Sequence, residues 1–144
     1  GDMPRTTSQA QYSLPFAVAV QAIYGRIGLE HIEGAGLNDA RVADLIKRIS
    51  VSEARRHSEQ FPEFRRADVV MSLQDGRVLE TGTVDARGGD EDPLSEDEII
   101  AKFHEFAQTT LTPERAASIR NAVLGLMQPS SRLSDLAPLL IDPV

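Results

Sequence analysis

The longest apolar run of the chain lies near its N-terminus. Across Leu14–Tyr24 a single residue is clearly polar. Ser13 can cap a helix, Pro15 is tolerated in a first helical turn, and Gly25 can end the run, so the pattern predicts a helix here. A helix of this length without a polar face is too short to cross a bilayer. We therefore expect it to be buried in protein, with partners on more than one side.

Three further segments repeat apolar residues at helical spacing, and each follows a helix start signal. The start signals are Asn38 or Asp39, the capping box of Ser95 and Glu98, and the pair Thr112-Pro113. The predicted helices carry the apolar residues within Val42–Ile49, Ile99–Ala107 and Ala116–Leu126, and Ser134–Leu140 is expected to form a last short turn.

Alternating apolar residues predict strands in the middle of the chain. Ile49 and Val51 alternate with serines, which predicts a short strand. Val69–Leu73 and Val78–Val84 flank Asp75-Gly76, whose chemistry predicts a hairpin with a two-residue type I′ turn. The expected fold class is α+β, with a small antiparallel sheet covered by helices as a two-layer domain, followed by C-terminal helices.

Composition narrows the possible partners. The 144 residues suffice for one domain, or for a piece of a larger protein, and contain no cysteine or tryptophan. A net charge of −7 and few aromatic residues argue against nucleic-acid binding. Neither a signal peptide nor a membrane span is visible, so we expect a cytoplasmic protein without a membrane partner.

The chemistry-bearing residues do not assemble into a complete active site. The histidines His31, His57 and His104 lie far apart without metal-ligand spacing, and we interpret them as structural or exposed. The pairs Arg55-Arg56 and Arg65-Arg66 could receive a carboxylate, although a solvated rim is the preferred interpretation. The sequence indicates neither a metal site nor a cofactor site.

Four motifs, in order along the chain, resemble the MmgE/PrpD family. That family includes 2-methylcitrate dehydratase, cis-aconitate decarboxylase and iminodisuccinate epimerase. The matching stretches are Gln9–Ala19 (E-A-[KRQ]-[FY]-S-[LMF]-x-[YF]-x-x-A in the family), Leu73–Arg77 (L-x-D-G), Gly89–Ser95 (G-x-x-x-x-P-L-S, here with three residues instead of four between the glycine and the proline) and Glu98–Phe103 (E-[LI]-x-x-K-F).

The resemblance implies that the chain is the C-terminal third of a longer enzyme. Residues 1–108 would be most of an α+β lid domain, and residues 109–144 would be helices that pack on a large helical domain absent here. Such enzymes are metal-free lyases or isomerases that abstract a proton next to a carboxylate of a small di- or tricarboxylate. We expect no turnover from the chain alone. The alternative is a non-catalytic binding or oligomerisation module that retains the lid fold.

The resemblance also implies lid residues that face the substrate. Relatives usually have a tyrosine where this chain has Phe16, so either the reaction differs or Tyr12 supplies the phenol. Gln11 stands where several relatives have lysine or arginine, and we include it with Ser13 as substrate-binding candidates. The helix that holds Phe16 is either plain core or an active-site wall. If the chain stands alone, we expect a homodimer formed through the N-terminal helix or the last two helices.

Overall fold

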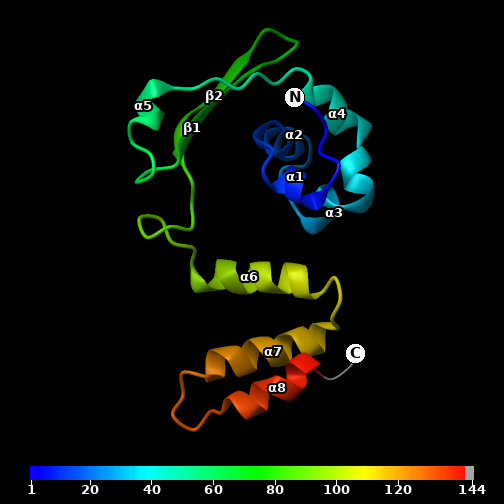
Figure 1. Cartoon of the computed structure of the whole chain (residues 1–144), viewed down its shortest axis with the longest axis vertical. Coiled ribbons are helices and arrows are strands. Elements are labelled where there is room, and N and C mark those ends of the chain that lie inside the picture. Colours follow the sequence, from blue (N-terminus) through cyan, green and yellow to red (C-terminus); the bar gives the residue numbers. More distant parts are fainter. Residues whose placement is uncertain (142–144) are drawn as a thin grey trace. The chain divides into compact units, whose positions relative to one another are not determined.

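The computed structural model of the chain describes residues 1–141. In chain order its elements are α1 (Thr7–Gln11), α2 (Leu14–Tyr24), α3 (Leu29–Ile32), the 3₁₀ turn η1 (Gly34–Asn38), α4 (Ala40–Ile46), α5 (Arg55–Ser58), β1 (Arg66–Ser72), β2 (Val78–Asp85), α6 (Glu96–Ala107), α7 (Pro113–Gly125) and α8 (Leu133–Ile141) (Figure 1). They form a small α+β fold with a two-stranded antiparallel sheet, which confirms the predicted class. The chain divides into two compact units, residues 1–83 and residues 84–144.

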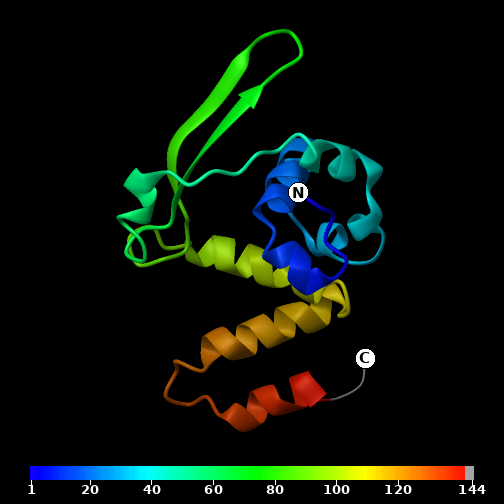
Figure 2. The ribbon, with the colours of Figure 1, turned by 45° about the horizontal axis from the view of Figure 1, so that its top comes forward.

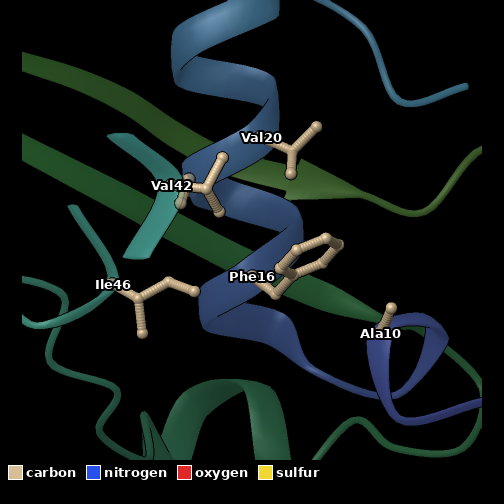
Figure 3. Packing of buried hydrophobic residues seen from close by; sticks show 6 residues of the cluster. Ala10, Phe16, Val20, Val42 and Ile46 are labelled. Carbon is tan, nitrogen blue, oxygen red and sulfur yellow. The ribbon is translucent and has the colours of Figure 1, made fainter. Parts of the chain in front are cut away.

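The core of the first unit is built around α2. Its buried side chains come from α1, α2 and α4 and are Ala10, Phe16, Ala19, Val20, Val42 and Ile46 (Figure 3). Helix α2 begins and ends at the predicted residues. Ser13 Oγ accepts the Phe16 N–H at its start, and Gly25 adopts a left-handed φ of 72° at its end. One side of α2 is buried, whereas Leu14 at its start is exposed. The residues that the structure describes therefore bury only one side of α2.

The predicted strand over Ile49 and Val51 is wrong. These residues have no strand partner among the described residues, and the segment leaves α4 as an irregular connection. The Ile49 N–H donates to the Ile46 carbonyl at 3.0 Å, and the Ile49 side chain packs against the α2 core. Val51 is exposed. The partly buried Ile49 and the exposed Val51 stand two positions apart, and over so short a stretch this spacing resembles the alternation of a strand.

The hairpin is confirmed, but its turn differs from the predicted one. Gly76 has a φ of 87°, whereas Asp75 does not have the positive φ that a type I′ turn requires. The Leu73 N–H donates to the Arg77 carbonyl at 2.8 Å and the Gly76 N–H to the Leu73 carbonyl at 3.1 Å. This is a three-residue loop, a type I turn closed by a left-handed glycine. The Asp75 carboxylate stabilises it locally by accepting the Arg77 N–H.

A second glycine, Gly82, interrupts the regular pairing of β2 with β1. The Val69 N–H donates to Thr81 Oγ1 at 3.0 Å, and Thr83 Oγ1 donates to Asp68 Oδ1 at 2.9 Å. From the first bond to the second, β1 steps back by one residue, from Val69 to Asp68, whereas β2 advances by two, from Thr81 to Thr83. The extra residue, Gly82, has a φ of 65°, which is the arrangement of a β-bulge. All of β2 is solvent-exposed.

The second unit has a small apolar core. Within residues 84–141 the buried side chains are Ala116 and Ile119 of α7 and Leu136 of α8. Figures 1 and 2 show α7 and α8 side by side, and Arg115 joins them by donating to the Leu139 carbonyl at 2.9 Å. Both predicted start signals operate, since Ser95 and Thr112 cap α6 and α7.

The capping box at the start of α6 leads to a prediction about pH. Ser95 Oγ accepts the Glu98 N–H, while the Glu98 carboxylate accepts the Ser95 N–H and two bonds from Arg87. The Arg87 bonds, and then the bonds from Ser95, lower the pKa of Glu98 to about 2 from its ordinary 4.5. A lowered pKa stabilises the fold above the ordinary value, and that contribution disappears as the pH falls through the lowered one.

We therefore expect the Glu98 carboxyl to titrate near pH 2 in an NMR titration, and the start of α6 to stay ordered below pH 4.5. In Arg87→Ala the titration should move back towards 4.5 because the first cause of the shift is removed. A native Glu98 that titrates near its ordinary value would contradict the capping arrangement.

Within residues 1–141 every helix is too short or too polar to pass through a membrane.

Candidate functional site

The structure separates the two aromatic candidates of the N-terminal motif. Tyr12 lies between α1 and α2 and its side chain is 91% exposed, whereas Phe16 is 1% exposed. Figure 3 shows the Phe16 ring on the side of α2 that faces Ala10 of α1, and Phe16 belongs to the same buried cluster as Val42 and Ile46 of α4. The ring of Phe16 is therefore part of the core of the first unit, and the phenol of Tyr12 is accessible to a ligand or a partner.

The two polar candidates flank Tyr12. Gln11 is the exposed last residue of α1, and Ser13 is the half-buried cap of α2. Ser13 Oγ accepts the Phe16 N–H at 3.4 Å, and the Ser13 N–H donates to the Ala10 carbonyl at 3.3 Å. The hydroxyl proton of Ser13 is still available as a donor. Gln11, Tyr12 and Ser13 thus form a short polar corner between two helices, which we name the α1–α2 corner.

A second group of polar side chains was missed by the sequence reasoning. The Tyr24 hydroxyl at the end of α2 donates to the carboxylate of Asp39, which caps α4. Arg41 Nη2 donates to Tyr24 Oη at 2.6 Å and lies 3.7 Å from Asp39 Oδ2. The Tyr24 bond is the main cause that lowers the pKa of Asp39. These contacts fasten the end of α2 to the start of α4.

His31 lies beside this group and is 8% exposed. Its Nδ1 accepts the Gly28 N–H at 2.9 Å, and its ring lies 4.5 Å from the ring of Tyr24. The backbone bond places the proton of a neutral imidazole on Nε2. His31 also lines a cavity of about 250 Å³, with Val20, Tyr24, Glu30, Ala35, Gly36, Asp39 and Val42. Its bond to the backbone at the start of α3 fits the predicted structural role.

A third polar group joins α5 to the hairpin. Asp68 Oδ2 lies 2.7 Å from His57 Nε2, and Asp68 Oδ1 accepts the Thr83 hydroxyl at 2.9 Å. Arg56 also bonds the Asp68 carboxylate. The bonds from His57 and then Thr83 lower the pKa of Asp68. The three partners lie 11 to 15 residues from Asp68 in sequence, without a motif spacing, so only the fold shows the cluster.

The paired arginines are largely engaged by groups of the protein. Arg55 Nε donates to Glu59 at 2.6 Å, and Arg66 Nη1 donates to Gln60 at 2.7 Å. With Arg56 on Asp68, these contacts favour the interpretation as a solvated rim over a carboxylate-binding cluster. Among residues 1–141, no three histidine, cysteine or acidic side chains gather closely enough to hold a metal ion.

Comparison with known proteins places these features in a family context. The family model "MmgE/PrpD C-terminal domain" matches residues 1–128. A cis-aconitate decarboxylase-like protein of Aspergillus oryzae is 28% identical over 142 residues, which cover 96% of this chain. The same alignment covers 28% of that relative, so the chain spans a little more than a quarter of the relative's length.

Proposed function

This chain belongs to the MmgE/PrpD family, and we propose that it is the C-terminal lid portion of a lyase or isomerase that acts on a small di- or tricarboxylate. The reaction we propose is proton abstraction next to a carboxylate, without a metal ion or an organic cofactor, in the cytoplasm. The relative's name refers to cis-aconitate, a tricarboxylate, which supports this substrate class. Because the chain spans little more than a quarter of that relative, we propose that the main acid–base residues lie on a large helical domain outside it.

One observation carries this proposal, the poor apolar burial of the second unit. Three apolar side chains are buried among residues 84–141, while several large ones are exposed. The exposed set includes Ile99, Val123, Met127, Leu133, Leu140 and Ile141. So much apolar surface on a small unit is typical of an interface. We propose that residues 1–108 act as the lid and that the helices of residues 109–144 pack on the large domain.

Within the lid, we propose that Tyr12 supplies the phenol that faces the substrate. Tyr12 is exposed at the α1–α2 corner, whereas Phe16 packs in the core and anchors α2 beneath it. Gln11 and Ser13 flank Tyr12 and carry a neutral amide and a hydroxyl, which can hydrogen-bond a carboxylate. The proposal assigns Tyr12 the proton donation or hydrogen bond at the reacting centre, and Phe16 the placement of the helix.

The test uses the chain both alone and fused to the helical domain of a relative. Alone it should show no dehydration, decarboxylation or epimerisation, because the main acid–base residues are proposed to lie outside it. In the fusion, Tyr12→Phe should lower kcat by about 100-fold or more, since a positioned proton donor is removed. The matched control is the free energy of unfolding of Tyr12→Phe, which should stay within about 0.5 kcal/mol of the parent because the site is exposed. Turnover by the isolated chain, or full activity of the variant, would contradict the assignment.

A second candidate function is a binding or oligomerisation module without catalysis. The same exposed apolar surface supports it, because a second copy could cover that surface as a homodimer. Sedimentation at micromolar concentration separates the two. If the chain forms a stable dimer that does not bind the helical domain, the result favours the binding module. If adding the helical domain converts the self-associated chain into a 1:1 complex, the result favours the lid.

A further inference from the structure

Helix α5 is attached to the hairpin by polar bonds. The buried apolar cluster of the first unit draws its members from α1, α2 and α4, and the partly buried residues around it are Met3, Ile23, Ile32, Leu37, Leu45 and Ile49. Neither set contains a residue of α5 or of the hairpin. Figures 1 and 2 both show α5 beside the strands. What fixes α5 there must therefore be sought among side-chain bonds.

Those bonds converge on one carboxylate. Asp68 on β1 bonds His57 and Arg56 of α5 and Thr83 of β2, so a single side chain joins three elements. The His57 side chain is 12% exposed and that of Asp68 is 22% exposed, which limits the access of competing water. Two of the three partners donate from α5, and one of these, Arg56, carries a positive charge. Bonds to an ionised acceptor are about twice as strong as bonds between neutral groups.

The segments around α5 give it freedom to move when these bonds are lost. α5 has four residues, and irregular chain separates it from α4 on one side and from β1 on the other. A helix this short is not stable by itself in water. Arg66 gives some additional attachment, because its guanidinium lies over the Phe64 ring at 4.0 Å and bonds Gln60.

We propose that α5 is a releasable strap, fastened across the base of the hairpin by Asp68 and freed when the Asp68 carboxylate loses its charge. Release exposes the side chains of His57 and Asp68, which are 12% and 22% exposed while the bonds are in place. Among the described residues, the side chains that bond Asp68 are the charged Arg56 and the titratable His57 from α5 and the neutral Thr83 from β2, while Arg66, on the same strand as Asp68, bonds Gln60. Because the pKa of Asp68 is lowered, the strap stays fastened at the ordinary aspartate value of 3.8 and opens only at lower pH.

Because the chain contains no cysteine, spin labels can be attached at introduced cysteines alone. Spin labels are placed through Ser58→Cys on α5 and Ser72→Cys on β1, both exposed positions, and the distance between them is measured by pulsed electron paramagnetic resonance. The parent should give one narrow distance distribution. Asp68→Asn and His57→Ala should each broaden it, and the two changes together should add little more, because they break the same fastening.

A second measurement, the chemical modification of His57, complements the distance between the spin labels. Diethyl pyrocarbonate modifies exposed imidazoles, and freeing α5 should raise the modification rate of His57 by about eightfold, the ratio of full exposure to 12% exposure. The rate at His31, which is buried in the core region, should not change.

Two variants keep the proposal falsifiable. Asp75→Asn removes a carboxylate that bonds only the hairpin turn, and it should leave both readouts unchanged. His57→Ala keeps the bonds that join the two strands, from Thr83 to Asp68 and from Val69 to Thr81, so we assign broadening in that variant to α5. A narrow distribution in His57→Ala, or equal broadening in Asp75→Asn, would overturn the strap.

Discussion

Replacing Phe16 with alanine is expected to lower the free energy of unfolding of the chain by about 3–5 kcal/mol, the usual cost of truncating a buried phenylalanine. Phe16 is the largest of the fully buried side chains and belongs to a cluster whose members come from α1, α2 and α4. Its removal leaves a cavity at the point where three helices meet. Since small domains are stable by about 5–15 kcal/mol, a loss of this size removes between about a fifth and nearly all of that stability. Urea denaturation followed by circular dichroism measures the change.

Tyr12→Ala is the matched control for this measurement. It removes an aromatic side chain of similar size four residues earlier, from a position that is 91% exposed. Its free energy of unfolding should differ from that of the parent by less than about 0.5 kcal/mol. If Phe16→Ala were as mild as Tyr12→Ala, Phe16 would have to be an exposed wall residue, and its assignment as the anchor of α2 would fail.

Replacing Gly36 with alanine should cost about 1–3 kcal/mol or more, as overpacking does when backbone must move. A Cβ at this position would lie 2.3 Å from the carbonyl oxygen of Glu30 and 2.5 Å from that of His31. Neither oxygen belongs to a flexible side chain, so η1 and α3 would have to separate. His31 and its bond to Gly28 lie in the same segment and should loosen with it. Thermal unfolding and the amide exchange of Gly28 report on the two effects.

Gly89→Ala is the corresponding control. A Cβ there meets no atom within 4 Å, and the residue does not have a positive φ. The substitution should be neutral or slightly stabilising, because alanine reduces the conformational freedom of the unfolded chain. Equal losses for Gly36→Ala and Gly89→Ala would mean that the close approach of η1 to α3 does not constrain the fold.

The local signals of the sequence predicted the longer helices α2, α4, α6, α7 and α8, but not the short helices α1, α3 and α5. Ser13, Ser95 and Thr112 each cap the helix expected of them, because capping depends on residues three positions apart. The strand over Ile49 and Val51 failed for the opposite reason. Whether an alternating stretch becomes a strand depends on a neighbour to pair with, and the described chain provides none.

The candidate site shows the same limit. The family resemblance drew attention to the α1–α2 corner, but only the structure separates the exposed Tyr12 from the buried Phe16. The Asp68 cluster was invisible in the sequence because His57 and Thr83 approach Asp68 only after the hairpin has formed and α5 lies against it. Burial and long-range contacts decide these assignments, and a sequence pattern read segment by segment does not contain them.

The bulge at Gly82 has a consequence for how the protein behaves at high concentration. β2 is exposed along its length and contains Val78, Leu79 and Val84, which are the kind of residues that form intermolecular sheets. A second chain can add to such a strand only while the spacing of its N–H and C=O groups is regular. The left-handed turn of the backbone at Gly82 interrupts that spacing in the middle of β2. We therefore expect Gly82 to hinder the addition of a second chain along the whole length of β2.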